Sequence, residues 1–339
     1  MSDSLLCFID YRSFPYALGD TFTLLMNMEI QRRLKGKDDI RQLVLADPHT
    51  PNSKYQPFVK EANFRNFLIE LFPAYLFSPS TSKLGFTENR YYFYHQLVKN
   101  TLKREAVWPG LYSQARGVVD FYSHRMINRF FRDYGYVPRL EAPAALRDRA
   151  QRKMAKLFPG KLVVTVNLRN SKSGYFFSAL HREAILPEWE KFFLQASRTH
   201  PHVIFLIVGS FGEWSRSFLN LPNVAISRRL GLGLADELSI LLHSRLFMGS
   251  SSGFSALATF SSVPYVIANF EPSAASHVGL TIGEGRYPFA EKDQIILWEG
   301  ETNAVLYENF SEVLSNDSLP TASINSTAGN MEAVRTSES

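Results

Sequence analysis

Three consecutive serines between two glycines form the most chemically suggestive segment of the chain. The segment follows an apolar run and precedes residues with helical spacing. Glycines permit a tight turn and a close backbone approach, while hydroxyls and the free N–H groups of a helix start bind phosphate oxygens. We therefore expect a phosphate or diphosphate site at Gly249, Ser250, Ser251, Ser252 and Gly253. The alternative is a plain helix-capping turn, although one cap needs only one serine.

The same turn also matches G-x-S-x-G, the nucleophile elbow of α/β-hydrolases, with Ser251 as the nucleophile. Such an enzyme needs an acid and then a histidine further along the chain, and only His277 follows Ser251. Too few strand-like segments remain to complete that fold, so the phosphate site is favoured over a hydrolase.

A second polar loop carries positive charge. It begins at the end of the apolar run 161–168 and is closed by Gly174. Fixed cations at such a place stabilise the charge that develops on a leaving diphosphate. We expect Asn167, Arg169 and Lys172 to contribute to the same site. The alternative is that the two cations are simply solvated.

Two further turns follow apolar runs. Gly209 and Ser210 end the run 201–209 and are expected near a ribose or sugar of the ligand. Ser227-Arg228-Arg229 precedes Leu230-Gly231-Leu232-Gly233, whose glycines could contact a base. That pair lacks the third glycine of a dinucleotide fingerprint, so no such fingerprint is predicted.

Several metal and nucleotide motifs are absent from the sequence. The chain has no P-loop, no H-E-x-x-H, no EF-hand loop and no D-x-D. We therefore expect neither a metal ion nor a cofactor, and arginine, lysine and helix termini are expected to bind the diphosphate.

Strands and helices must bring these loops to one place. Helical spacing is clear at 21–34, where Asp20 stands at the N-cap position, and residues 58–135 are mostly helical and aromatic in pattern. Their alternation with strands predicts parallel α/β sheets, in which ligands bind beyond the carboxyl ends of the strands. Strands are predicted at 5–9, 42–46, 161–168, 201–209, 223–226, 244–248 and 264–268, and further helices at 187–198, 235–243 and 253–260.

A proline-rich junction divides the chain. Residues 136–160 hold three prolines, the last of them in a closing Pro159-Gly160. We expect an α/β domain with a helical insertion over 1–150, a Rossmann-like domain over 151–314 and a disordered tail over 315–339. The two domains are expected to face each other across a cleft.

Charge and cysteine content restrict the partners. The net charge is +5, and residues 1–150 hold 21 Lys+Arg against 15 Asp+Glu. The basic segment 121–157 could face an anionic membrane, or it could be a solvated helix pair. No nucleic-acid module is recognisable. One cysteine and an acidic start without a signal pattern predict a cytoplasmic protein, with peripheral contact to the inner membrane as an extension.

The pattern over 161–270 resembles the donor half of GT-B glycosyltransferases. The resemblance is strongest to bacterial cell-surface enzymes of the heptosyltransferase and fucosyltransferase-like kind. It rests on the order of residues 235–268: a helix, a strand, the serine turn, a small-residue helix and a strand begun by Pro264. Asn167-Leu168-Arg169 is similar to the H-x-R strand end of the fucosyltransferase-like enzymes, with Asn in place of His. Residues 17–21 look like the G-D loop of heptosyltransferases.

The resemblance implies transfer of a sugar from a nucleotide-diphosphate donor to a glycan, lipid-linked or protein hydroxyl, with a GDP-sugar as the first candidate donor. It implies that Arg169 binds the diphosphate and that Asp20 is the base facing the acceptor; a plain N-cap aspartate is the alternative. A nucleotide-sugar epimerase of the same fold, using Glu213 and Glu271, is a rival. So is a non-catalytic binder of glycans or membranes.

Overall fold

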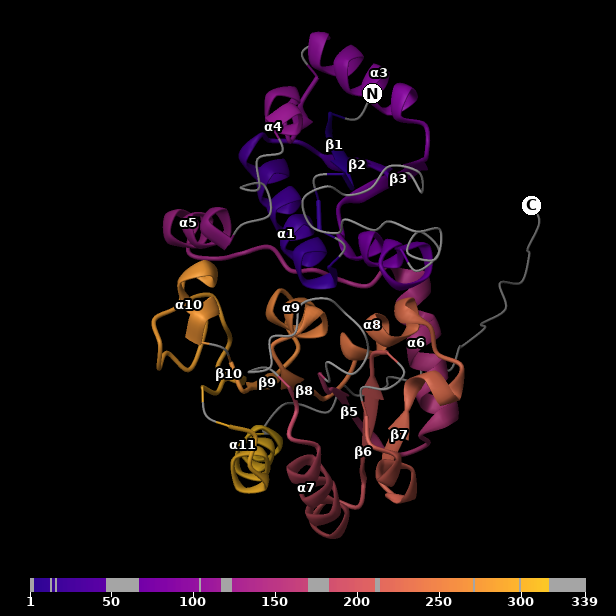
Figure 1. The fold of residues 1–339 in the computed structure, drawn as a ribbon, viewed down its shortest axis with the longest axis vertical. Helices are drawn as coiled ribbons and strands as arrows, with labels where there is room; N and C mark the ends of the chain where they lie inside the picture. The colour runs from indigo at the N-terminus through magenta and orange to yellow at the C-terminus, as the bar shows by residue number, and fades with distance from the viewer. Residues whose placement is uncertain are drawn as a thin grey trace, which may run out of the picture.

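The computed structural model describes residues 3–12, 14–15, 17–46, 67–103, 105–116, 124–169, 183–210, 214–270, 272–298 and 300–316. Two parallel sheets lie one above the other along the molecule (Figure 1). The first has the order β3-β2-β1-β4 and the second β10-β9-β8-β5-β6-β7. This confirms the predicted α/β class with two Rossmann-like halves.

The strands of the first sheet are β1 (Ser4–Asp10), β2 (Asp39–Leu45), β3 (Thr81–Thr87) and β4 (Val107–Trp108). Those of the second are β5 (Leu162–Asn167), β6 (Val203–Val208), β7 (Val224–Ile226), β8 (Leu246–Ser250), β9 (Tyr265–Ala268) and β10 (Gln294–Ile296). The helices are α1 (Leu18–Leu34), α3 (Arg90–Leu102), α4 (Leu111–Arg116), α5 (His124–Tyr134), α6 (Ala144–Leu157), α7 (Leu186–Thr199), α8 (Leu234–Leu241), α9 (Gly253–Thr259), α10 (Pro272–Val278) and α11 (Asn303–Ser315). Short 3-10 helices are η1 (Phe72–Phe77), η5 (Arg216–Asn220) and η6 (Ser227–Leu230).

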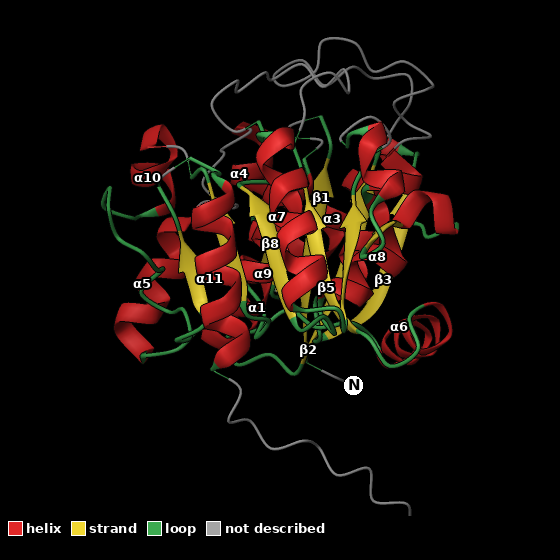
Figure 2. Cartoon of the chain, turned by 90° about the horizontal axis from the view of Figure 1, so that it is seen from below, coloured by secondary structure: helices red, strands yellow, loops and turns green. Residues whose placement is uncertain are grey.

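Helices cover both faces of the second sheet (Figure 2). Alternate strand residues point to opposite faces, so each strand contributes to two cores. On one face Val164 and Phe205 pack with Trp189 and Phe192 of α7 and Phe310 of α11. The opposite face, which includes Val163, Leu206, Phe247 and Tyr265, joins a cluster that contains α8, α9 and α1. One continuous core therefore runs through both halves.

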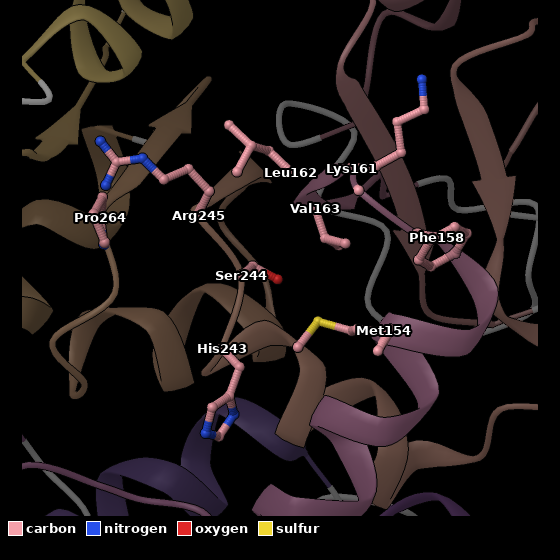
Figure 3. A pocket seen from close by; sticks show the side chains of 11 residues that line it. Met154, Phe158, Lys161, Leu162, Val163, His243, Ser244, Arg245 and Pro264 are labelled. Atoms are coloured by element: carbon pink, nitrogen blue, oxygen red, sulfur yellow. The ribbon is translucent and has the colours of Figure 1, made fainter. Parts of the chain in front are cut away.

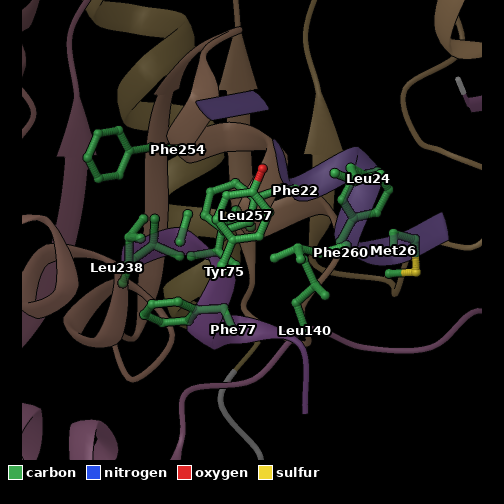
Figure 4. Packing of buried hydrophobic residues seen from close by; sticks show 14 of the residues in the cluster. Phe22, Leu24, Met26, Tyr75, Phe77, Leu140, Leu238, Phe254, Leu257 and Phe260 are labelled. Carbon is green, nitrogen blue, oxygen red and sulfur yellow. The ribbon is translucent and has the colours of Figure 1, made fainter. Parts of the chain in front are cut away.

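Helix α1 lies inside that core. Ten consecutive residues, Thr21–Ile30, are buried, because the sheet, η1 and α9 cover different sides of the helix. Figure 4 shows Phe22 and Leu24 of α1 beside Leu257 of α9 and Phe260, the residue that follows α9. A helix enclosed in this way has no polar stripe to reveal which face is buried.

Glu29 is the one buried carboxylate of α1, and serines from another segment surround it. Its side chain accepts hydrogen bonds from Ser78 Oγ at 2.7 Å and from the N and Oγ of Ser80 at 2.9 and 2.8 Å. Arg33 adds an ion pair at 3.0 Å. A buried charge is tolerated only when it is paired and hydrogen-bonded, so these donors fix α1 against the segment that follows η1.

The first turns of α1 and α9 touch. A Cβ built on Gly253 would lie 2.6 Å from Cβ of Leu18, and one built on Gly19 would lie 3.7 Å from Cα of Gly253. The glycines of the two predicted loops therefore allow two helix starts to approach each other closely.

Two local predictions were wrong. The first helix begins at Leu18, with Ala17 as its N-cap residue, so Asp20 lies inside the first turn and not at the cap. A carboxylate there is favourable because of the helix dipole. The mainly helical pattern predicted for 58–135 also contains β3, an edge strand whose sequence TSKLGFT has no apolar run.

The predicted domain boundary at residue 150 falls within α6. This helix packs on α8, and Arg149 and Lys153 form ion pairs with Asp236 at 2.7 and 2.8 Å. The stretch before it bridges the halves, since Leu140 N donates to Phe260 O at 2.7 Å and Glu141 N to Phe77 O at 3.0 Å. The boundary stays a proposal, and the predicted tail lies outside the described residues from 317 onward.

The α1–α9 contact predicts a compensating pair of mutations. Gly253→Ala should lower the free energy of unfolding by about 1–3 kcal/mol, because the new methyl group overlaps Leu18. In a Leu18→Gly background, which removes the Cβ at 2.6 Å as well as the rest of the side chain, the same change should cost less than half as much. Urea unfolding of the four proteins measures this coupling; additive losses would contradict the contact.

Candidate functional site

The loops that follow β5, β6 and β8 begin side by side. Asn167, the last residue of β5, is paired with Val208 of β6 on one side and Gly249 of β8 on the other. Because the strands are parallel, their carboxyl ends form one edge of the sheet. The structure thus brings together the starts of three loops that the sequence singled out separately.

Two of the predicted donor residues have structural contacts within the sheet edge. Asn167 is buried, and its Nδ2 donates to the carbonyl oxygen of Val208 at 2.9 Å. A Cβ at Gly249 would lie 2.3 Å from the backbone oxygen of Asn167, so only glycine fits there. These contacts hold the carboxyl ends of β5, β6 and β8 close together.

Of the three serines in the turn, only Ser252 caps the helix that follows. Ser252 is the N-cap of α9: its Oγ accepts from Ser255 N at 3.3 Å, and its own N donates to Ser255 Oγ at 2.8 Å. Ser250 is fully buried, and within the described part of the chain its Oγ has no hydrogen-bond partner. Ser251 is half-buried between them. Capping therefore accounts for one serine of the three.

Arg169 and Ser210 are half-buried just beyond β5 and β6. The carbonyl oxygen of Arg169 accepts from Ala184 N at 2.8 Å, which brings the chain back to the edge before α7. Of the other predicted residues, Lys172, Glu213 and Glu271 lie outside the described residues. Asp20 is half-buried in the first turn of α1.

Sequence reasoning missed a charged network at the same edge. Arg228 of η6 donates its Nε to the carbonyl oxygen of Gly209 at 3.1 Å. Its two Nη atoms bind both oxygens of Glu70 at 3.0 and 2.6 Å, and Nη2 also binds Glu237 at 3.1 Å. Arg228 had no predicted role of its own, since only the glycines that follow it were considered for contact with a base. In the structure it joins the segment before η1 to the second half.

Glu237 is the buried carboxylate of this network. It accepts from the hydroxyl of Ser227 and, at 3.3 Å, from Gly209 N. Burial raises the pKa of Glu237, against the effect of Ser227 and Arg228. The available sequence signal was an acidic residue directly before the largely apolar run LSILL. Glu237 fixes the backbone of Gly209, and so the start of the loop after β6.

The first half has its own polar cluster at the carboxyl end of β1. Asp10 is buried and accepts from Arg12 Nη2 at 2.8 Å, from Arg90 Nη1 at 3.2 Å and from the hydroxyl of Tyr94. Burial, followed by the bond to Asp10, raises the pKa of Tyr94 to about 12. The phenol therefore stays protonated and donates at neutral pH.

A shallow pocket opens at the opposite, amino edge of the second sheet (Figure 3). Met154, Phe158 and Leu162 line it, while the side chains of Lys161 and His243 point away from its centre. It is remote from the loops after β5, β6 and β8. Among the described residues, no three His, Cys, Asp or Glu side chains group as a metal site, and no helix is long and apolar enough to cross a bilayer.

Comparisons with known proteins identify the fold. The chain matches no protein-family model and no curated protein. Among solved structures, ADP-heptose LPS heptosyltransferase II of E. coli aligns with a TM-score of 0.54 and 12% identity, over 92% of this chain and 98% of that chain. A family 9 glycosyl transferase of Veillonella parvula DSM 2008 aligns with a TM-score of 0.55 and 11% identity, over 92% and 97% of the two chains.

The chain has the GT-B fold of these glycosyltransferases, with two parallel sheets of four and six strands. The resemblance to heptosyltransferase-like enzymes is thus confirmed at the level of the fold.

The buried carboxyl group of Glu301 should make the free energy of unfolding depend on pH. Its Oε2 accepts from Ile185 N and from Trp189 Nε1, both at 2.9 Å, at the start of α7. Burial raises its pKa to about 7. A raised pKa means that the stabilisation is complete below the unfolded-state pKa and is lost as the pH rises through the folded-state value.

Glu301→Gln should therefore abolish a loss of stability between about pH 4.5 and 7, because a neutral amide oxygen accepts the same two bonds. At pH 8 the variant should be more stable by up to about 3 kcal/mol. Urea unfolding across the pH range measures this, with Glu308→Gln, an exposed position on α11, as the matched control. Parallel pH profiles for wild type and Glu301→Gln would contradict it.

Proposed function

We propose that this protein transfers a sugar from a nucleotide-diphosphate sugar to a hydroxyl of a glycan, lipid-linked or protein acceptor, without a metal ion. The observation that carries the proposal is the convergence of the loops after β5, β6 and β8 at one edge of a GT-B sheet. The named donor of the E. coli neighbour, ADP-heptose, supports a nucleotide sugar in general. Its name also supports an acceptor in bacterial surface glycan synthesis.

Arg169 and the serine turn are the donor-binding groups in this proposal. Arg169 supplies a guanidinium for two parallel hydrogen bonds to diphosphate oxygens. The buried hydroxyl of Ser250 and the half-buried Ser251 add donors at the neighbouring strand end. Lys172, three residues beyond Arg169 in sequence, adds a second cation. Together these groups stabilise the charge of the leaving diphosphate.

Asp20 is the proposed base. The close contact between Leu18 and Gly253 brings the first turn of α1 beside the start of α9, so a carboxylate on α1 adjoins the donor edge. Asp20 accepts the proton of the acceptor hydroxyl, whose oxygen forms the new bond to the anomeric carbon. The bond from that carbon to the diphosphate oxygen breaks, and the electron pair leaves with the nucleoside diphosphate.

The donor site is tested first by ligand stabilisation. A nucleotide sugar at about 100 times its dissociation constant should stabilise the protein by about 2.7 kcal/mol. Thermal unfolding with GDP-, ADP-, UDP-, dTDP- and CMP-sugars, without added metal, should reveal one stabilising class. Arg169→Ala should abolish the shift and Arg198→Ala, an exposed position on α7, should retain it. No shift with any donor would contradict the diphosphate site.

Asp20→Asn tests the base with the donor identified above. The variant should bind the donor as the wild type does, and its transfer rate should fall by about 10²–10⁴-fold. Release of nucleoside diphosphate in the presence of acceptor measures transfer. If the donor sugar is epimerised without an acceptor, and at the same rate in Asp20→Asn, the protein is an epimerase and the proposed transferase activity is wrong. Donor binding without any turnover would favour a non-catalytic binder.

A further inference from the structure

Helix α3 has two opposite apolar faces, and only one of them is covered. Phe93 and Leu97 are buried and pack against Leu6, Phe8 and Leu45 of the first sheet. The second face is a stripe at positions i, i+4, i+7 and i+11, a spacing that places side chains on one side of a helix. Its members are Tyr91, His95, Val98 and Leu102.

The stripe is open to solvent. Tyr91 is 82% exposed and Leu102 is 78% exposed, which is unusual for large side chains at the two ends of one helix. The rings of Tyr91 and His95 stack at 6.3 Å, so the stripe is continuous at its start. Helix α4 contacts α3 and adds Tyr112, which is 69% exposed.

Positive charge borders the stripe. Lys99 and Lys103 are exposed beside Val98 and Leu102, and the sequence has no acidic residue between Glu88 and Glu105. Tyr92, on the same flank as Lys99, is 48% exposed. Exposed aromatic and aliphatic groups next to lysines, without acids, are the composition of helices that lie at the surface of anionic membranes.

The position of α3 suits contact with a plane. Figure 1 shows α3 at one end of the long axis of the molecule, with the second sheet and α7 towards the other end. A flat surface can therefore meet this helix without covering the loops after β5, β6 and β8.

We propose that the exposed face of α3 binds an anionic bilayer. Leu102 and Val98 enter the boundary of the acyl chains, the tyrosine rings lie at the headgroup level, and Lys99 and Lys103 bind lipid phosphates. A convex single-helix face with two aliphatic side chains offers a protein partner no groove to fill. Charge complementarity with acidic lipids accounts for the lysine border, and the headgroup boundary suits the exposed tyrosine rings.

The basic segment 121–157 is less suited to this role. In it Arg149 and Lys153 form ion pairs with Asp236, and these bonds hold α6 against α8. On α5, Arg129 and Arg132 both lie within ion-pair distance of Asp133. The membrane surface is therefore assigned to α3, independently of the proposed transferase activity.

A site-specific fluorescence experiment tests the assignment on the full chain. The single cysteine, Cys7, is buried, so Leu102→Cys can be labelled selectively with an environment-sensitive dye. Vesicles that contain phosphatidylglycerol should shift the emission to the blue, and vesicles of phosphatidylcholine alone should not. Tyr134→Cys, at a 56% exposed position on α5, is the matched control and should not respond.

Sedimentation with the same vesicles measures affinity. Each lysine near the membrane surface contributes about fivefold in binding, so Lys99→Glu with Lys103→Glu should reduce partitioning by more than about 20-fold. Charge reversal on α5, by Arg125→Glu with Arg132→Glu, should change vesicle partitioning by less than about threefold. An unaltered melting temperature of each variant verifies its fold. The proposal would be overturned if the dye on α5 shifted to the blue while the dye on α3 did not. It would also be overturned if the charge reversal on α5 reduced binding while that on α3 did not, or if the protein bound neither kind of vesicle.

Discussion

The close approach of α1 and α9 determines how the two halves of the molecule are arranged. Gly19 and Gly253 add no side chain of their own where the two helix starts meet, and the side chain of Leu18 packs against Gly253. The next ten residues of α1, Thr21–Ile30, are buried between the first sheet, η1 and α9. Because of this contact, the first turn of α1 lies beside the serine turn of the second sheet. Both the shared core and the candidate site depend on it.

Buried carboxylates fix the loops around this region. Glu29 binds the segment after η1, and Glu237 with Arg228 binds the backbone of Gly209 and reaches Glu70 from the other half. Asp10 holds Arg12 and Arg90 at the end of β1. In each case a charge is buried together with several donors, and loss of one partner would leave an uncompensated charge. The loops at the two sheet edges are thus positioned by charge pairing as much as by apolar packing.

The sequence predicted the second sheet well because its strands are continuous apolar runs separated by glycine-containing turns. Strands near 162–167, 203–208 and 246–250 follow from such runs, and so does the convergence of their loops. It missed β3, whose edge position removes the apolar pattern, and it placed Asp20 at a cap. It could not foresee Arg228 binding to Glu70 and Glu237, because that network joins residues 158 positions apart. The glycines of the serine turn were expected to admit phosphate, whereas one of them, Gly253, admits the start of a neighbouring helix.

The placement of α1 in a core shared by both halves also has a consequence for synthesis on the ribosome. Residues 18–34 emerge early, yet the helix that covers one side of them comes from residues 253–259. Until those residues are translated, Phe22 and Leu24 have only part of their partners. Sequence separation of this size makes folding slow and leaves apolar surface uncovered during elongation. Helix α1 therefore completes its packing only after residues 253–259, in the final third of the chain, have been translated.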